Sequence, residues 1–203
     1  DCEKPEWNLP ICKKARTAMN SYINLDQVTC VISPCSSQRY GDKYNRSWPI
    51  DHYIEVINHL ITIKVQVIIT GGNTAIEQKY SKSISNAFPD QITNLIGKSS
   101  IKELAAIISL SDFVISPDSG PVHIATTVNT PVIGLYAMSN PLRSGPYNSQ
   151  KWVIDAYEES LSVFMNTQIQ NVKWGQKIKH PKAMHLILPK TVIHSINQLI
   201  AAL

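Results

Sequence analysis

The sequence predicts an α/β fold with a doubly wound parallel sheet. Six short apolar runs recur along the chain, and most are continuous rather than alternating, which is typical of strands covered by helices on both faces. Segments of helical period lie between them, and a strand–helix–strand order favours parallel pairing with right-handed crossovers. The expected strands are Thr29–Ser33, Val65–Thr70, Ile92–Ile96, Phe113–Ser116, Pro131–Tyr136 and, from a weaker signal, Trp152–Ile154.

Local start signals place the helices. Pro49 suits a first helical turn, and the apolar residues after it recur at helical spacing. Thr74 and Ser100 each stand three residues before a Glu, which is the spacing of a capping box. The expected helical segments are Lys13–Tyr22, one from Pro49, Thr74–Asn86, one from Ser100, Pro121–Val128 and Lys190–Leu203. We therefore expect a lead-in arm and helix over residues 1–27 and one α/β domain over residues 28–203.

Composition excludes several classes of protein. With 43% hydrophobic and 17% charged residues among 203, the chain can bury a large core and is not disordered. No apolar run is long enough to span a membrane, and the start lacks a signal-peptide pattern. A net charge of +4 is too small to predict a nucleic-acid partner. The four Cys show no CxxC spacing, so we expect a reducing, cytoplasmic setting with no metal site and no cofactor.

The candidate site lies where the parallel strands end, because ligands bind outside the carboxyl ends of such strands. Small residues and hydroxyls dominate the loops there, and this composition lets backbone N–H groups approach phosphate oxygens. The sharpest segment is Asp118-Ser119-Gly120-Pro121-Val122-His123, in which Gly120 permits a tight turn and Pro121 starts a helix. Spacing alone also allows a purely structural role, with Asp118 as a cap and His123 on the rim.

Two stretches resemble a known family. The run DFVISPDSGPVHIATTVNTPVIGLYAMSNPLRSGPY and, upstream, VISPCSSQRYGDKYNRSWPIDHYIEVINHL are similar to the C-terminal domain of glycosyltransferase family 9, the ADP-heptose:lipopolysaccharide heptosyltransferases. The resemblance implies the Rossmann-like, donor-binding half of a two-domain GT-B enzyme. That enzyme moves heptose from ADP-heptose to a lipopolysaccharide core acceptor, in the cytoplasm and with peripheral contact at the inner face of the inner membrane.

The resemblance assigns donor-binding residues by position. The hydroxyl pair after the first strand falls on Ser36 and Ser37, and the phosphate-contacting position two residues before Trp-Pro falls on Arg46 where the family has Lys. The D-[ST]-G-x-x-H motif and the nucleotide-pocket position give further donor contacts, namely Asp118, Ser119, Gly120, His123 and Ser99. Thr74 stands near the place of the family's ribose-binding glutamate. Weaker candidates are Arg39, Glu77, which also suits a capping box, and Arg143.

The same resemblance implies that an acceptor-binding N-terminal domain is absent from these residues. The general base belongs to that domain, so no catalytic base is expected in this chain, and we expect the chain alone to bind donor with little or no transfer. Two alternatives stay open: a nucleotide-sugar epimerase or hydrolase on the same fold, and a nucleotide-binding module without catalysis. The lysines at positions 173, 177, 179 and 182 are expected on a solvated face, with attraction to an anionic acceptor or membrane as the second interpretation.

Overall fold

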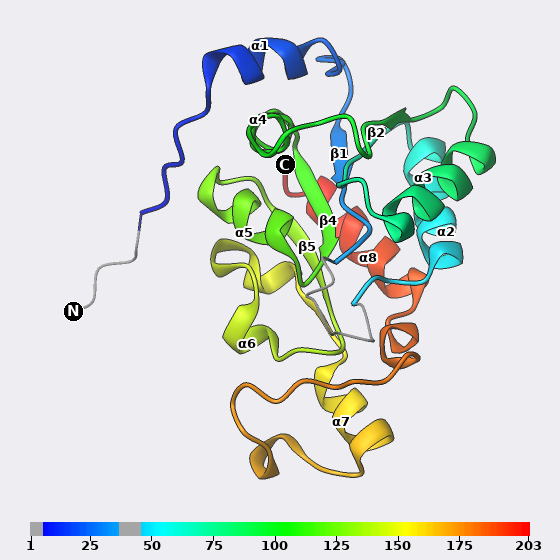
Figure 1. Ribbon diagram of the computed structural model, residues 1–203, viewed down its shortest axis with the longest axis vertical. Helices are drawn as coiled ribbons and strands as arrows, with labels where there is room; N and C mark the ends of the chain where they lie inside the picture. The colour runs from blue at the N-terminus through cyan, green and yellow to red at the C-terminus, as the bar shows by residue number, and fades with distance from the viewer. Residues whose placement is uncertain (1–5, 37–45) are drawn as a thin grey trace.

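A computed structural model describes residues 6–36 and 46–203. Six strands form one sheet in the order β3-β2-β1-β4-β5-β6, and every neighbouring pair is parallel. Figure 1 shows the strands crossing the middle of the molecule with helices in front of and behind them. The strands are β1 (Thr29–Ile32), β2 (Gln66–Ile69), β3 (Thr93–Asn94), β4 (Phe113–Pro117), β5 (Val132–Tyr136) and β6 (Ile154–Asp155).

Helices cover both faces of the sheet. The α-helices are α1 (Lys13–Asn20), α2 (Ile50–Thr62), α3 (Ala75–Ala87), α4 (Ile101–Leu110), α5 (Gly120–Thr127), α6 (Pro141–Ser144), α7 (Tyr157–Met165) and α8 (Pro189–Ile200). Three 3₁₀ segments join them: η1 (Tyr147–Trp152), η2 (Ile169–Asn171) and η3 (Ala183–Leu186).

Alternate residues of a strand belong to two separate hydrophobic clusters, one on each face of the sheet. In β1, Cys30 and Ile32 pack with α2, α3 and α8, whereas Val31 packs on the other face with α1, α4 and α5. All three side chains are fully buried. A strand buried on both faces reads as a continuous apolar run, so the doubly wound prediction is confirmed.

The predicted caps of α3 and α4 form. Thr74 Oγ1 accepts from the Glu77 N–H while the Glu77 carboxylate accepts from the Thr74 N–H, and Ser100 and Glu103 repeat the arrangement. These reciprocal bonds satisfy backbone donors that a helix start leaves free. The two helices therefore begin where the sequence predicts.

Two α-helices of the described residues were not predicted, and the third strand is shorter than expected. In α6 the Asn140 side chain caps a single turn that Pro141 begins. In α7 only Tyr157, Ser160 and Leu161 are buried, so this helix contributes little to the core. The third strand pairs only through Thr93 and Asn94, not over the whole predicted run.

Candidate functional site

The order of the sheet places a crevice between β1 and β4. On one side of β1 the sheet continues with β2 and β3, and on the other side it continues with β4, β5 and β6. Loops from the carboxyl ends of β1 and β4 therefore diverge to opposite sides, and ligands of open α/β sheets bind at this position. At the start of these loops the Ser116 hydroxyl donates to the Ser33 carbonyl at 3.2 Å, so the ends of β1 and β4 lie side by side there.

Ser36 fixes the two ends of the loop after β1. Its hydroxyl accepts from the Arg46 N–H at 2.8 Å, and its own N–H donates to Ser47 Oγ at 3.1 Å. Ser36 is buried, so its hydroxyl stabilises the loop rather than opening onto solvent. Ser37 and Arg39, which the resemblance also assigns to donor binding, lie outside the described residues.

The Arg46 guanidinium is paired with a carboxylate. Arg46 Nη1 lies 2.9 Å from Asp118 Oδ2, and the two side chains are 21% and 11% exposed. Ser139 donates its hydroxyl to the same oxygen at 2.6 Å. Three loops, those after β1, β4 and β5, are thus joined at one carboxylate oxygen.

The N-terminus of α5 is open toward the site. Ser119 is the N-cap residue, but its hydroxyl bonds to Ser116 Oγ at 2.9 Å instead of capping the helix. Gly120 does not have a positive φ, and apart from its chain neighbours and the backbone of α5 itself no protein atom lies within 4 Å of the place where a Cβ would sit. The chain therefore turns into α5 without using the left-handed conformation that favours glycine, and the space beside Gly120 allows close approach of a ligand to the backbone.

A hollow of about 340 Å³ gathers several of these residues. Five of the assigned donor-binding positions line it, four of them being Arg46, Asp118, Ser119 and Gly120. His123, on the first turn of α5, and Arg143, on α6, line it as well. The sequence motif and the loop arginine therefore come together in space, as the resemblance implies.

Ser36 does not line this hollow, and three further assigned positions lie elsewhere. Thr74 and Glu77 bond to each other at the start of α3, where Glu77 Oε1 also accepts from the Gly72 N–H at 2.6 Å. Ser99 is half-buried just before the Ser100 cap of α4. None of the three lines the hollow beside α5. Their contact with a donor stays a prediction, and the capping role of Glu77 is confirmed.

Two side chains that support the site could not be predicted from the sequence. Ser139 holds Asp118, and its only signal was its place in the loop after the fifth strand. Tyr136 donates its hydroxyl to the Ser144 carbonyl at 2.9 Å and so ties α6 to β5. Burial and, to a smaller extent, the Asp118 carboxylate raise the pKa of Tyr136, which keeps the phenol protonated for this bond.

One lysine expected on a solvated face is placed differently. Lys177 is half-buried and lines the hollow with Arg46 and Arg143, whereas Lys173, Lys179 and Lys182 are exposed. The expectation of a uniformly solvated run is therefore wrong at Lys177. The cause is an antiparallel bridge between Lys177 and Ser139, which draws this residue to the end of β5.

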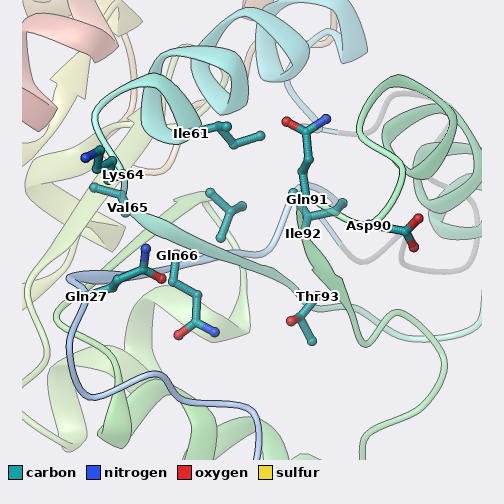
Figure 2. A pocket seen from close by; sticks show the side chains of 10 residues that line it. Gln27, Ile61, Lys64, Val65, Gln66, Asp90, Gln91, Ile92 and Thr93 are labelled. Carbon is teal, nitrogen blue, oxygen red and sulfur yellow. The ribbon is translucent and has the colours of Figure 1, made fainter.

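A second hollow, of about 390 Å³, lies at the other end of the strands, where β2 and β3 begin (Figure 2). Its lining includes Lys64, Gln66 and Asp90, near the amino ends of β2 and β3. The Gln66 amide is already occupied, because it accepts from the Asn24 N–H and donates to the Tyr22 carbonyl. This hollow is a crease where the chain before β1 is held to the sheet, away from the strand ends that bind ligands.

The profile of glycosyltransferase family 9 (heptosyltransferase) matches residues 1–174 of this chain. The chain belongs to this family. Among curated relatives, the lipopolysaccharide core heptosyltransferase OpsX of Haemophilus influenzae is 36% identical over 196 residues, which cover 97% of this chain and 55% of the relative. Lipopolysaccharide heptosyltransferase 3 of Escherichia coli is 33% identical over 111 residues, covering 54% and 31% of the two chains.

Solved structures agree on the fold of this family 9 chain. The ADP-heptose lipopolysaccharide heptosyltransferase II of E. coli superposes with a TM-score of 0.71 at 21% identity, covering 96% of this chain and 54% of that one. A family 9 glycosyltransferase from Veillonella parvula gives 0.73 at 18% identity, covering 97% and 54%. The chain thus spans about half the length of the relatives it matches.

Within residues 6–36 and 46–203, no group of three His, Cys, Asp or Glu side chains could hold a metal ion. Over the same residues, no helix is both long and apolar enough to cross a membrane.

Proposed function

We propose that this chain is the donor-binding domain of an inverting heptosyltransferase and that it holds the diphosphate of ADP-heptose in the hollow beside α5. The observation that carries the proposal is the meeting of Arg46, Gly120 and His123 at the carboxyl ends of β1 and β4. Cationic side chains and free helix N–H groups are the donors that bind phosphate oxygens best. The relatives' heptosyltransferase names support ADP-heptose as the donor.

In the proposed reaction, this domain acts on the leaving group. An acceptor hydroxyl attacks the anomeric carbon of the heptose, the bond from that carbon to the diphosphate oxygen breaks, and ADP departs with the extra negative charge. Arg46 and the N–H dipoles of α5 stabilise that charge as it develops. The proton of the acceptor hydroxyl goes to a general base, which we assign to the other half of the full-length enzyme.

The relatives also support a proposal for the acceptor and the cellular site. A relative with 36% identity is named for the lipopolysaccharide core, so we propose that core as the acceptor of the full-length protein. We further propose a cytoplasmic enzyme with peripheral contact at the inner face of the inner membrane, favoured by the exposed Lys173, Lys179 and Lys182.

Because the chain spans about half the length of its relatives, we expect it to bind donor but to transfer little heptose alone.

Gly120→Ala tests the site without disturbing the fold. A Cβ at position 120 meets no protein atom, so the variant should unfold at the wild-type temperature or slightly above it. The same Cβ blocks the approach of a phosphate to the α5 backbone. Calorimetric titration should therefore show ADP and ADP-heptose binding to the wild type and at least about tenfold weaker binding to Gly120→Ala.

Titration with other nucleotides separates the alternatives. Selective binding of ADP and ADP-heptose over UDP and GDP supports the heptosyltransferase domain. Preference for UDP would contradict it and favour a different nucleotide-sugar enzyme. If Gly120→Ala binds ADP as tightly as the wild type, the diphosphate does not lie at α5.

A further inference from the structure

Lys177 differs from the other lysines of its segment in where it lies. It is half-buried at the wall of the hollow, while Lys173 and Lys179 on either side are exposed. The segment carries no helix or strand of its own, only the single bridge to Ser139. In Figure 1 it is the orange chain that crosses the lower end of β5 after α7.

Backbone bonds hold this segment in place on both sides of Lys177. The Ile178 N–H donates to the Met138 carbonyl at 3.0 Å, and the Tyr157 hydroxyl donates to the Gln176 carbonyl at 2.9 Å. Ile178 is also buried in the larger hydrophobic cluster. The position of Lys177 is therefore fixed by the fold rather than by chance contact of a mobile surface chain.

Arg143 shares the same wall. A Cβ built on Gly175 would lie 3.5 Å from Arg143 Nε, so the guanidinium rests against the segment that carries Lys177. Tyr136 anchors α6, and with it Arg143, through the bond to Ser144. Two cations from distant parts of the sequence thus face one hollow.

The charges around the hollow do not cancel. Its charged lining consists of Arg46, Arg143 and Lys177 against one carboxylate, Asp118, with His123 in addition. Arg46 forms an ion pair with Asp118, and across residues 6–36 and 46–203 this is the single ion pair. The uncompensated positive charge therefore belongs to Arg143 and Lys177, not to the arginine that the family pattern singles out.

We propose that Lys177, with Arg143 beside it, binds the diphosphate of the nucleotide. A diphosphate carries two to three negative charges and gains most from cations that hold no carboxylate already. Arg46 also faces the diphosphate with its remaining N–H donors, but Asp118 already offsets much of its charge. The inference rests on the proposed function, because it names the group that recognises the phosphates of the same donor.

Lys177→Gln tests this inference, with Lys179→Gln as the matched control from the same segment. Glutamine keeps the part of the aliphatic stem nearest the backbone and ends in a polar group of similar reach, so the thermal unfolding midpoint of this half-buried position should stay near that of the wild type. Calorimetric titration with ADP should show about a tenfold weaker affinity for Lys177→Gln and no change for Lys179→Gln. Lys177→Arg should restore most of the affinity.

A second readout separates charge recognition from a structural role. The slope of log Kd against log salt should be shallower in Lys177→Gln than in the wild type, and the loss of affinity should be larger for ADP than for AMP. Equal ADP affinity of Lys177→Gln and Lys179→Gln, beside clear wild-type binding, would overturn this inference alone. Absence of ADP binding by the wild type would instead overturn the proposed function, and this inference with it.

Discussion

Asp118 organises the site through a single oxygen. Oδ2 accepts from Arg46 Nη1 at 2.9 Å and from the Ser139 hydroxyl at 2.6 Å, and both Asp118 and Ser139 are buried. An ion pair with this little exposure is costly to break by removing one partner, because the other charge is left desolvated. Asp118 therefore acts on the loops as much as on any ligand.

A double-mutant cycle measures that coupling. Asp118→Ala and Arg46→Ala should each destabilise the fold, and the double variant should lose less than their sum, with a coupling of about 1–2 kcal/mol. Urea unfolding of the four proteins provides the values. Additive losses would mean that the pair contributes nothing to the free energy of unfolding.

The cysteines should differ in reactivity. Backbone N–H groups of Ala15 and Lys14 at the start of α1 lower the pKa of the exposed Cys12. Burial raises the pKa of Cys35 to about 12 and raises that of fully buried Cys30 as well. Because the thiolate is the nucleophile, iodoacetamide should label Cys12 in the native protein and label Cys30 and Cys35 only after denaturation. Peptide mass mapping reports this, and early labelling of Cys30 would contradict it.

At the scale of elements, the two capping boxes provide a matched pair. Thr74→Ala and Ser100→Ala should each cost about 1 kcal/mol of stability, because each removes the same bond at a helix start. The donor-binding prediction for Thr74 adds a difference between them. If Thr74 contacts the nucleotide, only Thr74→Ala weakens ADP binding in a titration; equal affinities would leave Thr74 with the cap alone.

The contact of α2 with η3 should depend on pH. Burial and the neighbouring His185 lower the pKa of His52 from its ordinary value near 6.5, outweighing the Ile187 carbonyl, Glu55 and Asp51, which raise it. The unfolded chain then binds a proton more readily than the folded one. The contribution of His52 to the free energy of unfolding is therefore fully present above about pH 6.5. It is lost as the pH drops through the lowered pKa of the folded state.

His52→Leu tests the linkage. Unfolding free energy of the wild type should decline from pH 7 to pH 5, and the decline should be shallower in the variant, as chemical unfolding at a series of pH values would show. An identical slope in both proteins would assign the pH dependence to other groups.

Elements with a local signal could be predicted from sequence, and those fixed by distant contacts could not. The capping spacing at Thr74 and the apolar run of β4 place α3 and β4 to within one residue. Lys177 lies in an aperiodic stretch and reaches the hollow through a bridge to Ser139, 38 positions earlier, which no local pattern encodes. The same holds for Ser139 itself, whose bond to Asp118 joins two separate loops.

At the scale of the molecule, the sheet order explains why the site lies where it does. Two hydrophobic clusters cover the two faces of the sheet, so the strand ends are where polar loops gather. At the carboxyl ends the loops converge around Asp118, and at the amino ends Gln66 is used to hold the chain before β1 (Figure 2). Among the described residues, Arg143 and Lys177 line the hollow at the carboxyl ends without a carboxylate partner, whereas the hollow at the amino ends has one lysine, Lys64, together with Asp90 in its lining.

Hydrogen exchange with and without ADP tests the central claim most directly, because it locates the ligand. Saturating ADP should slow exchange in peptides covering residues 118–123, 139–145 and 175–178, which contribute the lining of the hollow beside α5. Slower exchange confined to residues 64–67 and 90–93, at the hollow of Figure 2, would contradict the account and place the nucleotide at the amino ends of the strands.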